Sequence, residues 1–283
     1  SASGGSKYYC QTTCYYSLDK DKTSQYKKWY GNAAKELGLS GDVKDNEFKK
    51  ILEGKIEYNN EKIHLGNRRE GEIDHSPGRD LTFAAPKSVS LQHNLEGGDK
   101  RIKNALIKAA ENTLEYVQDN FVYTRVKQDG KVSLEKTDNI AAALFYENLN
   151  RDKEFHDHVH CVVANLTQRK DGTWRSTELR RIFDNQIHIG KVFRMELAFN
   201  LRSLGYDLEV SDKENYFFEI KGFDKKLSEN FSERTQNILI KAKELNRDLN
   251  VKVRQLANFL TRNPDKKITP NDLKILTDNK IEN

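Results

Sequence analysis

The chain has 283 residues, of which 36% are hydrophobic and 32% charged, and its formal net charge is +5 at pH 7. This length allows one large domain, or one domain with a smaller appendage. No apolar window approaches the roughly 18 residues of a membrane span, no P-loop glycine pattern is present, and three cysteines are too few for a disulfide framework. The composition therefore excludes a membrane-spanning chain, a disulfide scaffold and a P-loop nucleotide hydrolase.

In chain order, hydrophobic periodicity and turn residues predict alternating helices and strands. The predicted helices cover residues 23–39, 45–53 with Gly54 as the stop, 100–118, 184–204, and much of the chain after 224, with a helix start at Pro270. The predicted strands cover residues 78–83, 121–127, 132–136, 139–147, 156–167, 206–211 and 215–220. We therefore expect an α+β fold in which helices pack on a central antiparallel sheet and the C-terminal portion is helical.

The strand predicted around residue 158 carries the strongest chemical signal. From residue 155 it reads Phe-His-Asp-His-Val-His-Cys-Val-Val, and side chains alternate faces along a strand. His156, His158 and His160 therefore share one face, while the residues between them supply a buried side. Two imidazoles about 7 Å apart along a strand face can converge on one cation. We interpret His158 and His160 as metal ligands.

A third ligand should come from the preceding strand. Glu147 stands eleven residues before His158, far enough for a hairpin that returns its carboxylate beside the imidazoles. His156 is the competing third ligand, because it already lies on the same face. A mixed set of histidines and carboxylate suits Mg²⁺ or Mn²⁺, and Zn²⁺ is not excluded.

Two tandem tyrosine pairs, Tyr8-Tyr9 and Tyr15-Tyr16, stand near the amino terminus. A phenol is a poor nucleophile at its free pKa near 10. A metal that polarises a phosphate, or a nearby base, makes attack by the phenol easier. Attack on phosphorus would leave a covalent phosphotyrosine that retains the bond energy for rejoining, and two pairs would permit two successive transfers. The alternative is that the tyrosines are stacking platforms or core residues.

Together these residues resemble the MobF-class conjugative relaxases, the TraI/TrwC-like branch of the HUH endonucleases. The matching stretches occur in family order: the tyrosine pairs, Glu36-Leu-Gly-Leu-Ser-Gly41, Asp80-Leu-Thr-Phe-Ala-Ala-Pro-Lys-Ser-Val-Ser90, Leu144-Phe145, Arg151, His158-Val-His160 through Asn165-Leu-Thr167, Asp171-Gly-Thr-Trp174 and Phe231-Ser-Glu-Arg-Thr-Gln236. They span roughly residues 3–240. Any one of them alone is a weak signal, and the ordered set is specific.

The resemblance implies a palm-like HUH sheet over residues 1–223 and a helical, fingers-like extension over residues 224–283 that closes over DNA. It also implies a site- and strand-specific nick at a plasmid origin of transfer, a 5′-phosphotyrosine intermediate, and re-ligation after transfer. By position, Tyr8 matches the initiating nucleophile and Tyr15 the candidate for the second transfer, with Tyr9 and Tyr16 beside them. Asp80 matches an aspartate that activates the tyrosine or orients a metal-bound histidine.

Two features depart from the family pattern. Family members carry His where this chain has Glu147, so we expect the site to keep its metal, to gain a negative charge and to prefer Mg²⁺ or Mn²⁺. Family members also begin with a strand before the Ser/Gly-rich segment and usually carry a helicase after this domain. We therefore expect the chain to be a piece of a longer protein.

Binding of single-stranded DNA needs cations for the phosphates and aromatic or apolar surfaces for stacking. The predicted phosphate contacts are Arg79, Lys87, Arg151, Arg169, Lys170 and Arg234. The expected partners are single-stranded or hairpin origin DNA, relaxosome accessory proteins and type IV secretion coupling proteins. We expect a monomer in the cytoplasm of a bacterial donor cell, without membrane insertion, that can accompany the DNA to the recipient.

Other functions remain open from the sequence. A rolling-circle replication initiator or a transposase uses the same HUH chemistry at a different DNA site. A catalytically silent DNA-binding module with a structural metal would bind a hairpin without forming a covalent adduct. A metallohydrolase acting on small molecules would leave the tyrosine pairs without a role.

Overall fold

The computed structural model of the chain describes residues 26–69, 72–150, 152–244, 253, 256–257, 260–261 and 270–282. The chain divides into two compact units, and the division passes through several elements. The first unit comprises residues 1–83, 105–146 and 158–200, and the second comprises residues 84–104, 147–157 and 201–283. Among the described residues, no helix is both long and apolar enough to cross a membrane.

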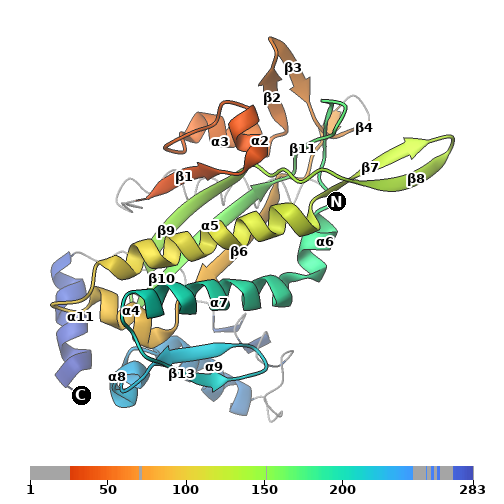
Figure 1. Cartoon of the computed structure of the whole chain (residues 1–283). Helices are drawn as coiled ribbons and strands as arrows, with labels where there is room; N and C mark the ends of the chain where they lie inside the picture. The colour runs from red at the N-terminus through yellow and green to blue at the C-terminus, as the bar shows by residue number, and fades with distance from the viewer. Residues whose placement is uncertain are drawn as a thin grey trace. The chain divides into compact units, whose positions relative to one another are not determined.

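The largest sheet among the described residues has four strands (Figure 1). Its strand order is β1-β9-β10-β6, so β1 and β6 are the edge strands. The strands are β1 (Lys27–Tyr30), β6 (Gly78–Ala84), β9 (Ala142–Leu149) and β10 (Phe155–Ala164). The β1–β9 pair is antiparallel, with Lys27 opposite Phe145 and Tyr30 opposite Ala142. This architecture confirms the predicted α+β fold with a central antiparallel sheet.

The helix predicted over residues 23–39 is wrong in its described part. Residues Lys27–Tyr30 are strand β1, and only Asn32–Glu36 form a short helix, α2. Gly31 separates the two with φ of 104°, and a Cβ at this position would lie 2.1 Å from the carbonyl oxygen of Ile140. Pairing with β9 therefore outweighs the local preference of these residues for helix.

Two layers of apolar side chains cover the faces of the sheet. On one face, alternate residues of β9 and β10 such as Ala143, Phe145 and Val162 join a buried cluster with Phe48 of α3 (Asp45–Leu52). On the other face lie the long helices α5 (Arg101–Phe121) and α7 (Gln186–Ser203), as Figure 1 shows. Phe83 of β6 stacks on Phe193 of α7 with ring centroids 4.8 Å apart.

Short hairpins and one short helix complete the first unit. They are β2 (Lys55–Tyr58) with β3 (Glu61–His64), β4 (Asn67–Arg69) with β5 (Glu72–Asp74), β7 (Tyr123–Gln128) with β8 (Lys131–Lys136), β11 (Thr167–Gln168) with β12 (Trp174–Arg175), and helix α6 (Leu179–Asp184). The predicted hairpin turn at Asp129-Gly130 is confirmed, because both residues have positive φ, 50° and 75°. The β2–β3 and β4–β5 hairpins were not expected.

The second unit carries the helical C-terminal portion. Its remaining elements are α4 (Lys87–Asn94), β13 (Leu208–Asp212), β14 (Phe217–Ile220), α8 (Lys225–Asn230), α9 (Glu233–Glu244) and α11 (Pro270–Glu282). Helix α11 begins at Pro270, as predicted for a proline in the first turn of a helix. Lys280 near its end donates to the buried carboxylate of Glu154 at 2.7 Å. Glu154 also accepts from the backbone N–H of Glu233, so one carboxylate joins α11 to the start of α9.

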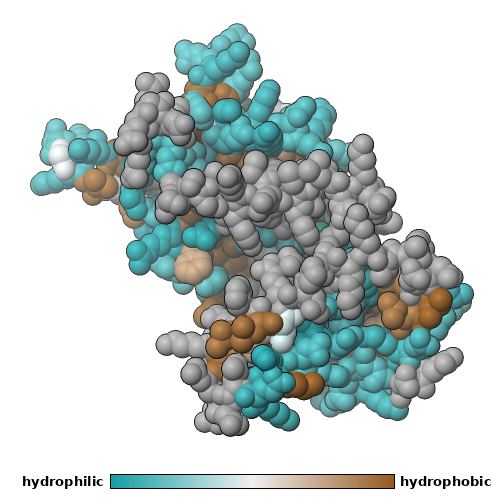
Figure 2. All heavy atoms as spheres, turned by 180° about the vertical axis from the view of Figure 1, so that it is seen from behind, coloured by the Kyte–Doolittle hydropathy of each residue, from teal (hydrophilic) through white to brown (hydrophobic). Residues whose placement is uncertain are grey.

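The described surface is largely hydrophilic, as the high charged fraction requires. Among the coloured atoms of the face in Figure 2, teal predominates, with a few separate brown patches. Scattered exposed apolar side chains are normal for a folded protein.

Candidate active site

Strand alternation gathers the predicted metal ligands on one sheet face. Glu147 continues the alternate row of Ala143 and Phe145 along β9, and His158 and His160 continue the row of Val162 along β10. Near one end of the sheet these rows are apolar and buried. Farther along the same face they become polar. The sheet therefore supplies a fixed backbone for the three predicted ligands.

These three side chains converge closely. Glu147, His158 and His160 each offer one ligand atom, and these atoms all lie within 4.8 Å of one another. The two imidazole rings have centroids 4.9 Å apart and an interplanar angle of 73°, an edge-to-face arrangement. His158 is buried at 8% exposure, while Glu147 and His160 are partly exposed. A cation bound there would therefore have protein on one side and an open side toward solvent.

Asp80 of β6 orients one of the histidines. The Nδ1–H of His160 donates to Oδ2 of Asp80 at 2.8 Å, and the hydroxyl oxygen of Thr82 lies 3.1 Å from the same nitrogen. With Nδ1 held in this way, Nε2 of His160 carries the lone pair available to a metal. Of the two roles implied for Asp80, this contact supports orienting a histidine.

The donor set fits a divalent cation. Two imidazoles and one carboxylate form a mixed nitrogen and oxygen set, and a carboxylate partner behind a ligating histidine is typical of protein metal centres. His156, the alternative third ligand, is not a member of the converging group among the described residues. The assignment of Glu147 as third ligand stays a prediction that this geometry favours.

The predicted nucleophiles belong to another part of the chain. Tyr8, Tyr9, Tyr15 and Tyr16 lie outside the described residues, as does Arg151. Their roles stay predictions from the sequence.

A buried polar cluster on the second unit supports the histidine strand from its other face. Asp157 is fully buried, and its carboxylate contacts His93 Nδ1 and Asn94 Nδ2, each at 2.8 Å. The hydroxyl of Ser90 accepts from the backbone N–H of Asp157 at 3.0 Å. Helix α4 is therefore fixed to β10 immediately before His158. Sequence reasoning missed this cluster, although a carboxylate at a buried strand position signals a partner.

The structure places two of the predicted phosphate contacts in different settings. Arg79 is exposed on β6, and its guanidinium lies 5.2 Å from the ring centre of Phe183. Lys87 is partly buried at the start of α4, where its ammonium donates to the carbonyl oxygen of Phe155 at 2.9 Å. Burial lowers the pKa of Lys87. Arg79 is thus free to meet a phosphate, whereas Lys87 already has a main-chain partner.

The remaining predicted contacts also differ from one another. Arg169 forms ion pairs with Glu135 at 2.8 Å and Asp171 at 2.6 Å, which offset much of its charge. The neighbouring Lys170 is exposed. Arg234 donates to the carbonyl oxygen of Thr261 at 3.1 Å within the second unit. Lys170 is therefore the better placed of these three for a phosphate.

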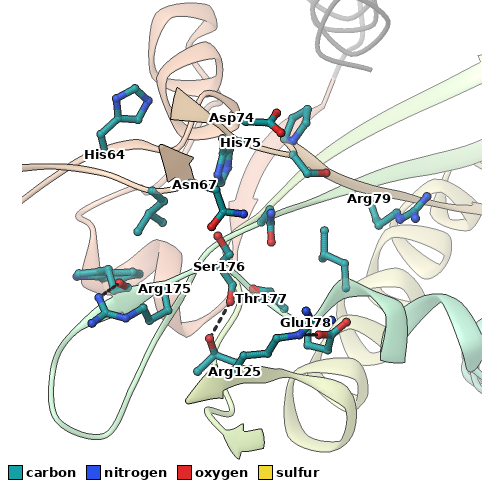
Figure 3. Close-up of a pocket in the computed structure, with 18 of the residues that line it drawn as sticks. His64, Asn67, Asp74, His75, Arg79, Arg125, Arg175, Ser176, Thr177 and Glu178 are labelled. Atoms are coloured by element: carbon teal, nitrogen blue, oxygen red, sulfur yellow. Dashed lines mark hydrogen bonds and ion pairs between the residues drawn. The ribbon is translucent and has the colours of Figure 1, made fainter. Parts of the chain in front are cut away.

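A large polar pocket in the first unit was not anticipated from the sequence (Figure 3). Its volume is about 1020 Å³, and its described lining comes from the β3–β6 region, β7, and the segment from β12 into α6. The arginines among its lining residues are Arg79, Arg125, Arg175 and Arg180. We call this the arginine pocket. Only Arg79 was predicted as a DNA contact, because the others lie on the short strands β7 and β12 and on helix α6, which sequence periodicity does not bring together.

The comparisons with known proteins agree with this geometry. A family model described as TrwC relaxase matches residues 2–280. Two proteins named multifunctional conjugation protein TraI, both from Escherichia coli, are 34% and 33% identical over 279 residues. Each alignment covers 95% of this chain, and the chain spans only 15% of the length of these relatives.

Solved structures give the same result in three dimensions. TrwC relaxase in complex with oriT DNA, in a copper-bound form, is similar with a TM-score of 0.85 and 30% identity, covering 97% of this chain and 93% of that chain. A metal-bound TrwC complex with oriT DNA has a TM-score of 0.84 and 31% identity, covering 96% of this chain and 93% of that chain. Because the family model matches nearly the whole length of this chain, the chain belongs to the TrwC relaxase family.

Proposed function

We propose that this chain is the relaxase domain of a conjugation protein, and that it nicks and rejoins single-stranded DNA at an origin of transfer. The observation that carries the proposal is the convergence of Glu147, His158 and His160 beside Asp80, within a chain of the TrwC relaxase family. TrwC itself has been solved with oriT DNA and with bound metal, which supports DNA as substrate and a divalent metal as cofactor.

Glu147, His158 and His160 would hold the metal, and Asp80 would orient His160 from behind. When bound, the cation supplies positive charge that polarises a phosphate oxygen of the scissile DNA. We propose Mg²⁺ or Mn²⁺, because the carboxylate of Glu147 is a hard oxygen ligand and adds a negative charge to the site.

We propose Tyr8 as the initiating nucleophile. Its phenol oxygen forms a bond to phosphorus as the bond from phosphorus to the 3′ oxygen breaks, and the phenol proton passes through a base to that 3′ oxygen. The product is a 5′-phosphotyrosine on one side and a free 3′ hydroxyl on the other. Reversal with the same or another 3′ hydroxyl rejoins the strand, and Tyr15 would serve a second transfer.

The rest of the domain would guide the DNA and its partners. We propose Arg79, Lys170 and Arg151 as phosphate contacts, and the helical segment from residue 224 as the part that closes over DNA. Relaxosome accessory proteins and a type IV secretion coupling protein are the partners proposed from the family. The proposed location is the donor-cell cytoplasm, with transport alongside the DNA.

Covalent capture tests this function for an origin of any sequence. A random-sequence single-stranded DNA library with a 3′ fluorescein is incubated with the protein and Mn²⁺, washed under denaturing conditions and released by protease. We expect captured sequences to share one motif and to transfer to a second, unlabelled strand with a free 3′ hydroxyl. EDTA and Glu147→Gln should reduce capture strongly.

Three results would contradict parts of the proposal. Capture by Tyr8→Phe at the wild-type level would remove Tyr8 as the nucleophile. Tight binding of the library without any adduct in Mg²⁺ or Mn²⁺ would indicate a silent DNA-binding module. A captured motif that lies at a replication origin would favour the rolling-circle alternative.

A further inference from the structure

One side chain on helix α4 joins the two strands that carry the predicted metal ligands. The Nδ2 amide of Asn94 donates to Oδ1 of Asp157 on β10 at 2.8 Å. The Oδ1 atom of Asn94 accepts from Nδ2 of Asn148 on β9 at 2.9 Å. We call this chain of hydrogen bonds, Asn148–Asn94–Asp157, the asparagine clasp. It runs from one strand to the other through a single side-chain amide.

The clasp holds the residues that are covalently bonded to two of the predicted ligands. Asn148 directly follows Glu147 along β9. Asp157 directly precedes His158 along β10. Because successive side chains of a strand point to opposite faces, the clasp lies on one face of the sheet and the ligands lie on the other. A displacement of the backbone at Asn148 or Asp157 therefore moves the adjacent ligand.

The amide of Asn94 has one favourable orientation. Its oxygen and one N–H serve the clasp, and Nδ2 also donates to the carbonyl oxygen of Ser90, one turn earlier in α4, at 2.8 Å. A flipped amide would set its oxygen against the carboxylate of Asp157 and the carbonyl of Ser90. It would also set its N–H donors against the N–H donors of Asn148. The amide therefore links the two strands in a single arrangement.

Further contacts with α4 anchor the β10 end of the clasp. Asp157 is fully buried, and its Oδ2 atom lies 2.8 Å from Nδ1 of His93. The backbone N–H of Asp157 donates to the hydroxyl oxygen of Ser90 at 3.0 Å. Movement of Asp157 would break several hydrogen bonds of a buried carboxylate, which is costly. Helix α4 is thus a firm base from which Asn94 holds Asn148.

The clasp acts close to the ends of both strands. Strand β9 ends at Leu149 and β10 begins at Phe155, so Asn148 and Asp157 stand within two residues of these ends. The ends of elements open more readily than their centres. Leu91 of α4 already packs with Phe155 and Leu149 in one hydrophobic cluster, but apolar contacts are not directional. A satisfied polar network, in contrast, specifies one arrangement of the groups that it joins.

A metal centre tolerates little movement of its ligands. The ligand atoms of Glu147, His158 and His160 all lie within 4.8 Å of one another. Bonds from a divalent cation to nitrogen or oxygen are roughly 2.0–2.2 Å long and vary by about 0.2 Å. A shift of one strand end by about half an ångström exceeds that tolerance. The spacing of the two strands at the clasp therefore decides how well the ligands fit a cation.

From these observations we propose that Asn94 is a positioning residue for the metal centre, and that the asparagine clasp sets the spacing between Glu147 and His158. The inference rests on the proposed function, which assigns these two residues to a metal site. Asn94 acts through the backbone of β9 and β10, so it is not a catalytic residue.

A double-mutant cycle on metal affinity tests the clasp. Titration calorimetry measures Mn²⁺ binding by the full chain in wild type, Asn94→Ala, Asn148→Ala and the double variant. Loss of a group that directly supports a metal ligand weakens metal binding roughly tenfold to a hundredfold. Because the clasp acts one residue away from the ligands, we expect each single variant to bind Mn²⁺ roughly threefold to tenfold more weakly. The double variant should bind no more weakly than Asn94→Ala, because either substitution already opens the clasp.

A spectroscopic measurement and a matched control separate positioning from general stability. The absorption spectrum of bound Co²⁺ depends on the number and arrangement of its ligands, so it should differ between wild type and Asn94→Ala. The control is Asn120→Ala on α5, where Nδ2 donates to the carbonyl oxygen of Tyr116, also one turn earlier, at 2.9 Å. This control should keep both the Mn²⁺ affinity and the Co²⁺ spectrum of wild type. Circular dichroism confirms that each variant is folded, and if Asn94→Ala does not fold, Asn148→Ala decides alone.

The two proposals fail in different ways. If wild type binds Mn²⁺ and the clasp variants bind it equally well, or if their losses add in the double variant, the clasp does not position the ligands and the proposed function stands. If the variants behave as expected but covalent capture yields no adduct, the clasp assignment holds and the strand-transfer function fails. A wild type that binds neither Mn²⁺ nor Mg²⁺ would overturn both proposals.

Discussion

Asp80→Asn removes a negative charge behind His160 while keeping the size and shape of the side chain. In the structure the carboxylate of Asp80 lies 2.8 Å from Nδ1 of His160, and the two side chains are 23% and 15% exposed. The amide oxygen of Asn can still accept from Nδ1–H. The variant therefore isolates the effect of the charge on the basicity of Nε2, the nitrogen that would ligate the metal in the proposed site.

The magnitude follows from the role of such partners. Removing the group that hydrogen-bonds a metal-ligating histidine costs roughly tenfold to a hundredfold in metal affinity. This corresponds to about 1.4–2.7 kcal/mol. Because Asp80 is partly exposed and Thr82 still contacts His160, we expect the lower part of this range, about tenfold.

Titration calorimetry with Mn²⁺ measures the effect directly. Asp45→Asn is the control, since Asp45 lies in the first turn of α3 and forms no part of the site. We expect tenfold weaker Mn²⁺ binding for Asp80→Asn and no change for Asp45→Asn. Equal affinities of Asp80→Asn and wild type would refute the argument that the Asp80–His160 contact tunes a metal ligand.

Three further predictions concern the metal, the fold and pH. Glu147→His should keep a metal site but favour Ni²⁺ and Zn²⁺ over Mn²⁺, as competition titrations would show; an unchanged preference would remove Glu147 from the ligand set. His93→Phe should lower the free energy of unfolding by roughly 3 kcal/mol or more in urea, because Asp157 loses a partner in a fully buried site, and a cost under 1 kcal/mol would contradict this. The pKa of His75 is 6.5 in the unfolded chain and about 4 in the folded protein, because burial disfavours the charged ring. Below pH 6.5 the unfolded chain therefore binds a proton that the folded protein does not. The free energy of unfolding should be highest above pH 6.5 and fall by about 1–3 kcal/mol toward pH 4. His75→Phe should flatten that fall, and an identical pH profile would disprove it.

Much of the site could be predicted because it depends on strand alternation. The spacing of His158 and His160 places both rings on one face of any strand, and the chain length back to Glu147 suits a return on the neighbouring strand. The structure brings all three together. The hairpin at Asp129-Gly130 was predictable for a similar reason, since its turn depends on residues that tolerate positive φ.

Features that depend on distant pairing could not be predicted in this way. The segment Lys27–Tyr30 contains no strand signal stronger than its helix signal, and it becomes a strand because β9 offers a partner. The β2–β3 hairpin has short, charged strands, although its turn residues Asn59 and Asn60 have φ of 50° and 63° and are a recognisable signal. The arginine pocket joins side chains from several strands, loops and helix α6, and no local pattern of sequence predicts that they meet.

The most direct test of the account is to find the amino acid that carries the DNA. After reaction with a captured oligonucleotide and Mn²⁺, the protein is digested with nuclease and protease, and the peptides are mapped by mass spectrometry. We predict a nucleotide attached through phosphate to Tyr8, formed with Mn²⁺ and absent with EDTA. A modified serine or histidine, or an adduct that forms equally well with EDTA, would contradict the claim that a tyrosine and a metal held by Glu147, His158 and His160 together cut the strand.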